Sequence, residues 1–198
     1  MKTGILLSGG MDSIALCYMT RPDYAITVDY GQRPAEAEIR SARQICDLLN
    51  IPQEVVKVDC SSIGSGDLFL KSSINISPVP EWYPFRNQLI LTLASIKAVE
   101  LGITDLMIGC VKSDSVHKDG TEDFIKAIDH LISLQEGEIR ISAPAIHMES
   151  EELITKSGIP QSILGWAHSC HKDIYACGMC RGCFKHRRIM SNLYNEIY

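Results

Sequence analysis

The chain has 198 residues, of which 45% are hydrophobic and 22% charged, and its 19 basic and 24 acidic residues give a net charge of −5. This size suits one domain over residues 1–198, and the acidic balance argues against a protein whose main task is to bind nucleic-acid phosphates. The apolar runs are too short for a membrane span and the start lacks a signal-peptide pattern, so we expect a cytoplasmic protein with no membrane partner, whose 8 cysteines are thiols or metal ligands rather than disulfides.

Short apolar runs alternate with helical patterns in the first part of the chain. Strands are expected at residues 4–7, 25–28 and 54–58, and helices over residues 14–19 and 39–49 lie between them. Strand–helix alternation of this kind favours a parallel sheet with helices on both faces.

The pattern resumes after a long connection. Residues 60–84 are rich in Ser, Gly and Pro, and long connections of this kind are often functional. A mostly apolar helix over residues 86–101 and strands over residues 105–110 and 139–143 follow, with an amphipathic helix between the two strands. The whole pattern predicts an α/β fold with a parallel five-stranded sheet flanked by helices.

A glycine-rich loop follows the first expected strand directly. Its members are Ser8, Gly9, Gly10, Met11, Asp12 and Ser13. Glycines let successive backbone N–H groups converge on an anion, and a helix that begins here adds its positive end. Ser8 and Ser13 offer hydroxyl donors, and Asp12 is suited to orient donors or to meet Mg²⁺. The loop lacks the Gly-Lys-Ser/Thr of a Walker A motif, and a tight turn before a capped helix is the alternative interpretation. Its place after the first strand favours a phosphate site.

A cysteine cluster marks residues 166–190 as a separate C-terminal segment within the domain. Its members are Cys170, Cys177, Cys180 and Cys183. Four thiolates at these separations can surround a tetrahedral Zn²⁺ ion, and full ligation would make that ion structural. An iron–sulfur cluster and free thiols are the alternatives. His168, His171 and His186 lie nearby and are interpreted as surface or hydrogen-bonding residues rather than ligands.

The loop at residues 8–13 resembles the pyrophosphate-binding loop of N-type ATP pyrophosphatases, which transfer AMP from ATP to a carbonyl or carboxyl oxygen. Together with the zinc segment, it resembles the QueC family of 7-cyano-7-deazaguanine synthases. Further shared features are residues 29–33, the pair Arg86-Asn87, and Gly109 and Asp114 after the fourth strand. The resemblance extends over most of the chain and implies an adenine nucleotide alpha hydrolase-like, Rossmann-like fold.

The resemblance implies a C–N bond-forming ligase of the queuosine-type 7-deazapurine pathway. With Mg²⁺, ATP adenylates a 7-deazaguanine carboxylate and pyrophosphate leaves; ammonia then displaces AMP, and a second adenylation converts the amide to a nitrile. ATP contacts would come from residues 8–13, and the enzyme would form a homodimer. The implied catalytic residues are Asp12, Ser13, Arg33 and Arg86. The implied substrate contacts are Arg33, Arg86, Asn87, Gly109 and Asp114.

Three positions depart from the family pattern. Phe85 stands where glycine is common, Pro34 where histidine is common, and Ser150 where a lysine is usual. These changes motivate an alternative, a QueC-like enzyme that conjugates the activated acid to a protein amine, with an operon partner protein, in a type IV CBASS-like anti-phage system. A tRNA thiolase, which would need a reactive cysteine, and an ATP-binding adaptor are further alternatives. The basic run at residues 185–188 is interpreted as a solvated helix face, and no stable nucleic-acid binding is expected.

Overall fold

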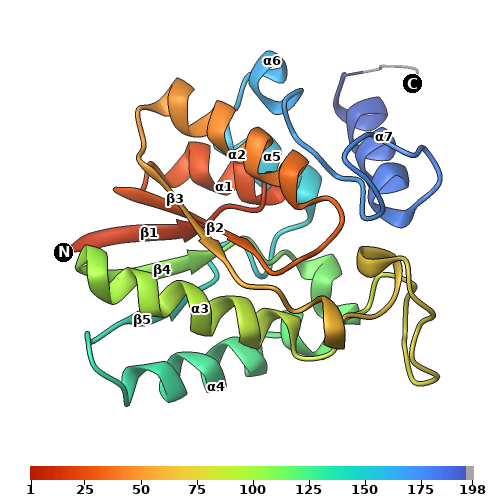
Figure 1. The fold of residues 1–198 in the computed structure, drawn as a ribbon. Coiled ribbons are helices and arrows are strands. Elements are labelled where there is room, and N and C mark those ends of the chain that lie inside the picture. The colour runs from red at the N-terminus through yellow and green to blue at the C-terminus, as the bar shows by residue number, and fades with distance from the viewer. Residues whose placement is uncertain (195–198) are drawn as a thin grey trace.

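A five-stranded parallel sheet runs through the computed structural model, which describes residues 1–194 (Figure 1). The order of the strands in space is β3-β2-β1-β4-β5, and every neighbouring pair is parallel. In chain order the strands are β1 (Lys2–Leu6), β2 (Tyr24–Asp29), β3 (Gln53–Lys57), β4 (Ile103–Ile108) and β5 (Arg140–Ser142). Most residues of the three central strands are apolar, and each strand has a run of buried residues, as parallel strands covered on both faces should have. The predicted parallel five-stranded sheet is confirmed.

Helices cover both faces of the sheet (Figure 1). On one face α1, α2 and α5 share a core that contains Ile14, Ile45 and Leu153, and on the other face α3 and α4 share a core that contains Leu91 and Ile128. The helices are α1 (Met11–Thr20), α2 (Ala35–Leu49), α3 (Arg86–Leu101), α4 (Glu122–Ser133), α5 (Ser150–Ser157), α6 (Gln161–Leu164) and α7 (Arg181–Tyr194). Within residues 1–194, none of these helices is both long and apolar enough to cross a membrane.

The long connection between β3 and α3 contains two short 3₁₀ turns, Ser61–Ile63 and Asp67–Phe69. The second turn packs its Phe69 ring edge-on against Tyr83, with the ring centroids 5.5 Å apart, and Tyr83 stacks on Tyr30. This aromatic cluster ties the connection to the carboxyl end of β2. The connection between β3 and α3 therefore lies beside the carboxyl ends of the strands and forms one wall there.

The direction of the chain through the sheet reverses beside β1. From β1 the chain proceeds outward through β2 and β3 and then returns to β4 on the other side of β1. β4 ends at Ile108, two residues earlier than expected, because its ladder partner in β1 ends at Leu6. The loops after β1 and β4 leave their strands in opposite directions, and such a switch point opens a crevice at the carboxyl ends of the strands.

Candidate active site

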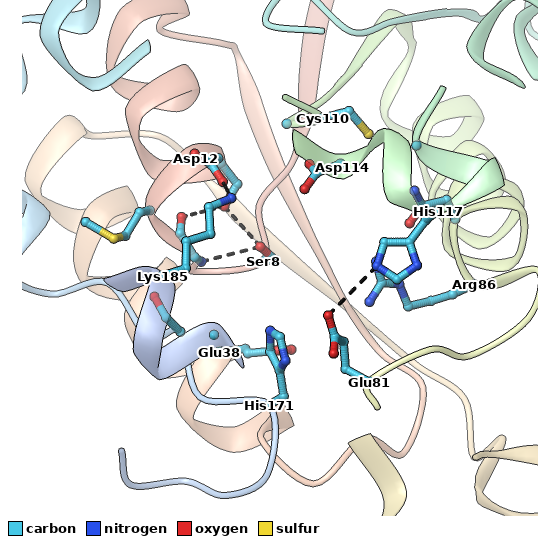
Figure 2. Close-up of a pocket in the computed structure, with 18 of the residues that line it drawn as sticks. Ser8, Asp12, Glu38, Glu81, Arg86, Cys110, Asp114, His117, His171 and Lys185 are labelled. Atoms are coloured by element: carbon cyan, nitrogen blue, oxygen red, sulfur yellow. Dashed lines mark hydrogen bonds and ion pairs between the residues drawn. The ribbon is translucent and has the colours of Figure 1, made fainter. Parts of the chain in front are cut away.

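A cavity of about 500 Å³ lies at this crevice, between the carboxyl ends of β1, β2 and β4 (Figure 2). Its volume is in the range of small-molecule sites. Most of the site residues expected from the sequence line it. These residues are Ser8, Gly10, Met11, Asp12, Ser13, Arg86, Asn87, Gly109 and Asp114. Gly9 and Arg33 are not among the lining residues.

The glycine-rich loop is a turn that leads straight into α1. Ser8 Oγ lies 3.1 Å from Ser13 Oγ and accepts a hydrogen bond from the Gly10 amide at 3.4 Å. Gly10 is the N-cap of α1, and no side chain caps the helix there. The backbone N–H groups of the first turn are therefore open to an anion at the positive end of the helix.

Gly9 shapes this loop from behind the cavity. Its backbone adopts a φ of 77°, and its carbonyl accepts hydrogen bonds from Ser41 Oγ at 2.9 Å and from the His168 amide at 2.8 Å. A Cβ at this position would lie 2.6 Å from the carbonyl oxygen of Glu38. Gly9 therefore makes the turn possible, while its neighbours face the ligand space.

Lys185 brings a cation to the loop from the far end of the chain. Its Nζ donates to Asp12 Oδ2 at 2.8 Å. Burial alone would lower the pKa of Lys185, but the carboxylates of Asp12 and Asp114 outweigh it and raise the pKa, so the ammonium stays charged. The interpretation of Lys185 as part of a solvated helix face is wrong, because α7 turns this side chain into the cavity. The sequence did contain one sign of this placement of Lys185. The spacing of Arg181, Lys185 and Arg188 places all three on one face of a helix.

The opposite wall begins with Arg86 and Asn87, the first residues of α3. The Asn87 amide N–H donates to Asp119 Oδ2 at 2.9 Å, and its side-chain Nδ2 donates to the Asp119 carbonyl at 2.7 Å, so Asp119 fixes the start of the helix. His117 faces the same space, and burial together with the charge of Arg86 lowers its pKa. The imidazole of His117 is therefore neutral at pH 7 and able to accept a proton.

The loop after β4 adds a carboxyl group and a thiol. Asp114 Oδ2 accepts a hydrogen bond from the Val111 amide at 3.0 Å, and burial raises the pKa of Asp114. Burial likewise raises the pKa of the Cys110 thiol to about 12. Cys110 is thus protonated at neutral pH and is a poor sulfur nucleophile. Gly109 allows the loop to approach α1, because a Cβ there would lie 3.0 Å from Ser13 Cα.

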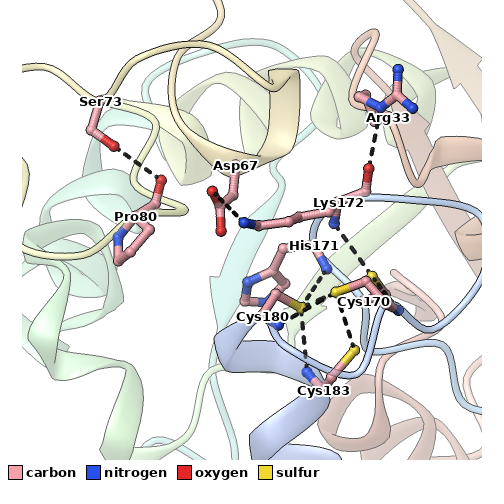
Figure 3. Close-up of polar contacts among 10 residues, drawn as sticks. Arg33, Asp67, Ser73, Pro80, Cys170, His171, Lys172, Cys180 and Cys183 are labelled. Atoms are coloured by element: carbon pink, nitrogen blue, oxygen red, sulfur yellow. Dashed lines mark hydrogen bonds and ion pairs between the residues drawn. The ribbon is translucent and has the colours of Figure 1, made fainter.

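Arg33 lies at the surface, outside the cavity (Figure 3). Its Nε donates to the carbonyl of Lys172 at 3.2 Å, its Nη2 lies 3.7 Å from Asp173 Oδ2, and its side chain is 46% exposed. In this arrangement Arg33 holds the cysteine-containing segment against the start of α2 and does not face a ligand.

Two of the three departures from the family pattern leave the cavity open. Phe85 occupies the left-handed backbone region at φ 59°, where glycine is favoured, but its ring points outward and the residue is 75% exposed. Ser150 is buried at the start of α5 and does not line the cavity. The cation beside the loop comes instead from Lys185 on α7.

The four C-terminal cysteines gather at the start of α7 (Figure 3). Their Sγ atoms all lie within 4.8 Å of one another, with Cys170 and Cys180 3.9 Å apart and Cys177 and Cys183 4.0 Å apart. A tetrahedral site with Zn–S bonds of about 2.3 Å needs sulfur atoms about 3.8 Å apart. Backbone N–H groups also donate to the sulfur atoms, as from Cys183 to Cys180 Sγ at 3.4 Å. The cluster fits a zinc ion, which would fix the helix that carries Lys185.

Several known proteins are similar to this chain. The family model described as "Queuosine biosynthesis protein QueC" matches residues 2–193. A 7-cyano-7-deazaguanine synthase from Methanosarcina barkeri is 29% identical over 219 residues, which cover 97% of this chain and 94% of the relative. One from Nitratiruptor sp. is 31% identical over 202 residues, which cover 92% and 90%. The NMN synthetase of Francisella tularensis has a TM-score of 0.50 at 14% identity, over 100% of this chain and 78% of that chain, which is a likeness of fold alone.

The loop geometry predicts unequal effects of two glycine substitutions. Gly9 and Gly102 both have positive φ, 77° and 70°, so alanine at either position costs about 1 kcal/mol or more in backbone strain. Only at Gly9 would the added Cβ also meet backbone, since nothing lies within 4 Å of one at Gly102. Urea unfolding should show that Gly9→Ala lowers the free energy of unfolding more than Gly102→Ala. Equal losses would contradict this description of the loop.

Glu38 should make stability depend on pH. Burial raises the pKa of this cavity-lining carboxyl to about 7, although Gln32 Nε2 donates to its Oε2 at 2.8 Å. Between pH 4.5 and about pH 7 the native state therefore keeps a proton that the unfolded chain has released. The contribution of the protonated carboxyl to the free energy of unfolding is fully present below pH 4.5 and is lost as the pH rises to about 7. The advantage of Glu38→Gln over the wild type should grow by roughly 2–3 kcal/mol between pH 5 and pH 8 in denaturant titrations. A stability difference between Glu38→Gln and the wild type that does not change with pH would contradict the raised pKa of Glu38.

The cysteine cluster predicts a metal requirement for folding. Cys180→Ser should reduce the zinc content measured by mass spectrometry of the metal and lower the melting temperature by several degrees, because a ligand is lost. Cys60→Ser is the matched control, since Cys60 is a buried thiol outside the cluster, and it should keep its zinc. Full zinc in Cys180→Ser, or loss of zinc in both variants, would count against the site.

Proposed function

The chain belongs to the QueC family of queuosine biosynthesis proteins, and from this premise we propose that it is a ligase that uses ATP to convert a 7-deazaguanine carboxylate into an amide and then a nitrile. One observation carries the proposal: a single cavity joins an uncapped helix N-terminus, the ammonium of Lys185 and the guanidinium of Arg86. A carboxylate is a poor electrophile, and transfer of AMP turns its oxygen into part of a leaving group. The cavity has the charges that such a transfer needs.

ATP would place its β- and γ-phosphates on the glycine-rich loop. The first-turn amides of α1 and the hydroxyls of Ser8 and Ser13 are donors, and Lys185 adds a positive charge beside them. Mg²⁺ bound with ATP would neutralise charge on the phosphates. Asp12 and Asp114 are the carboxylates on this side that would hold it, and Asp12 Oδ1 is buried with no hydrogen-bond partner among residues 1–194.

The first chemical step would form an acyl adenylate. An oxygen of the substrate carboxylate attacks the α-phosphorus, the bond to the bridging oxygen breaks, and pyrophosphate leaves with the electron pair. Negative charge grows on the departing β-phosphate, which in this arrangement would lie beside Lys185 and the α1 amides. Donors that are already in place stabilise that charge without reorganisation.

The next steps exchange oxygen for nitrogen. Ammonia attacks the acyl carbon, AMP leaves with the C–O electron pair, and a proton passes from nitrogen to a base, for which the neutral imidazole of His117 is the candidate. The amide oxygen then attacks the α-phosphorus of a second ATP, the bond to the bridging oxygen breaks, and a second pyrophosphate leaves with the electron pair. Departure of the second AMP, with loss of the remaining N–H protons, leaves the nitrile.

The alternatives differ mainly in the nucleophile. A protein amine would attack the same acyl adenylate, so the amide would become the end product and no nitrile would form. Sulfur transfer has little support from the two cysteines that line the cavity. The pKa of Cys110 is raised to about 12, and the sulfur of Cys170 belongs to the four-cysteine cluster. The homodimer and an operon partner protein stay predictions.

Pyrophosphate release should require both ATP and the deazaguanine acid. Lys185→Ala should slow this release about 100-fold, because the charge on the departing group loses its cation. Asp12→Asn should slow it as well, since it breaks the pair with Lys185. Lys156→Ala is the matched control, because Lys156 forms an exposed pair with Glu152 on α5, and it should release pyrophosphate at the wild-type rate.

Mass spectrometry of the products tests the nucleophile in the same reactions. With ammonium present, the acid should become the amide and then the nitrile. Release that is independent of the acid, or a Lys185→Ala enzyme as fast as the wild type, would refute the proposed adenylation. An activated acid that labels a peptide amine and never yields nitrile would establish the conjugating alternative.

A further inference from the structure

Glu81 is a buried carboxylate on the wall opposite the phosphate loop. The residue lies between β3 and α3, is 5% exposed and lines the cavity. Its Oε1 accepts a hydrogen bond from Arg181 Nη1 at 3.1 Å and lies 3.9 Å from His117 Nε2. Figure 2 shows Glu81 beside Arg86 and His117, across the open space from Asp12 and Lys185. No feature of the sequence had marked this residue.

The second oxygen of Glu81 has no partner. Oε2 is buried and accepts no hydrogen bond from any of residues 1–194. A buried carboxylate oxygen without a donor costs roughly 1–3 kcal/mol or more, so such atoms in folded proteins call for a partner. Gln53, Ser95 and Ser150 also have buried unpaired oxygens, but none of them lines the cavity. Asp12 Oδ1 and His171 Nδ1 are likewise buried and unpaired and do line it, but Asp12 belongs to the phosphate loop and His171 to the cysteine-containing segment. Glu81 Oε2 is therefore a candidate acceptor for a ligand in the cavity.

The other carboxylates near this wall are already engaged. Asp114 accepts from the Val111 amide at 3.0 Å, and Asp119 accepts from the Asn87 amide at 2.9 Å. Both bonds hold backbone in place, whereas Glu81 Oε2 is buried and has no hydrogen-bond partner among residues 1–194. Glu81 is thus the acceptor that this wall offers to a bound molecule with N–H groups.

We propose that Glu81 recognises the edge of the substrate ring that carries the ring N–H and the exocyclic amino group of a 2-amino-4-oxopyrimidine. The inference rests on the proposed function, because that function fixes the orientation of the ring. The carboxylate to be adenylated must face the α-phosphate beside the loop. The amino-pyrimidine edge lies at the far end of the same flat molecule and so faces the wall that carries Glu81, where adjacent N–H donors match a carboxylate.

Two other roles for Glu81 give different results in a binding experiment. Glu81 could serve only to hold α7 through Arg181, in which case its loss would weaken every ligand alike. It could instead accept from the ribose hydroxyls of the nucleotide, in which case its loss would weaken ATP and spare the ring. Recognition of the ring edge should act on one chemical group of one ligand.

Calorimetric titration of the zinc-loaded chain separates these roles. The probes are 7-deazaguanine, its analogue without the 2-amino group (7-deazahypoxanthine), and α,β-methylene ATP. The wild type should prefer 7-deazaguanine by about 10-fold or more. Glu81→Gln should remove that preference, chiefly by weakening 7-deazaguanine, because its amide NH₂ opposes the donors of the ring. Arg181→Met, which removes the ion pair and keeps the carboxylate, should retain the preference, and the nucleotide should bind Glu81→Gln as it binds the wild type.

Three results would overturn the proposed role of Glu81. A preference that survives in Glu81→Gln, a loss of preference in Arg181→Met, or a selective loss of nucleotide affinity in Glu81→Gln would overturn the proposal. Thermal unfolding of each variant identifies one that fails to fold, and Glu81→Asp then takes the place of Glu81→Gln, with the carboxylate withdrawn by one methylene and the preference expected to fall. Ring selectivity that depends on Glu81, without pyrophosphate release from the acid and ATP, would support this site and refute the adenylation. Pyrophosphate release from the acid and ATP, without ring selectivity that depends on Glu81, would support the adenylation and refute this site.

Discussion

The ion pair between Lys185 on α7 and Asp12 on α1 joins residues far apart in the sequence on one side of the cavity, and the arrangement of the candidate site depends on it. The glycine-rich loop is held on its other side by Ser41 and by the backbone of His168, both of which donate to the Gly9 carbonyl. A loop fixed from both sides keeps its amides in place when an anion arrives. The C-terminal segment therefore completes the phosphate site rather than merely following it.

The charges of the cavity differ from those of the whole chain. The net charge is −5, yet Arg181, Lys185 and Arg188 line the cavity from one helix and Arg86 faces them from another. Net charge describes the field far from the molecule, whereas a triphosphate responds to the groups within a few ångströms. Two of these cations pair with carboxylates that line the cavity, Lys185 with Asp12 and Arg181 with Glu81.

The sequence was most informative where a site consists of neighbouring residues. The loop at residues 8–13 and the four cysteines of the tail are local patterns, and the sheet follows from the alternation of strands and helices. Lys185 was misinterpreted because a basic run gives no sign of which side chain turns inward; only the packing of α7 decides it. Glu81 had no local signal, since its unpaired oxygen is a property of the folded wall. Arg33 sits in a recognisable motif, but contacts with Lys172 and Asp173 keep it at the surface.

A crystal structure of the zinc-loaded chain with α,β-methylene ATP and the deazaguanine acid would test the central claim most directly. The account predicts that the terminal phosphates contact the first-turn amides of α1 and the ammonium of Lys185, with the α-phosphorus facing the carboxylate of the acid. A nucleotide bound elsewhere, or a triphosphate directed away from the α1 N-terminus, would contradict it.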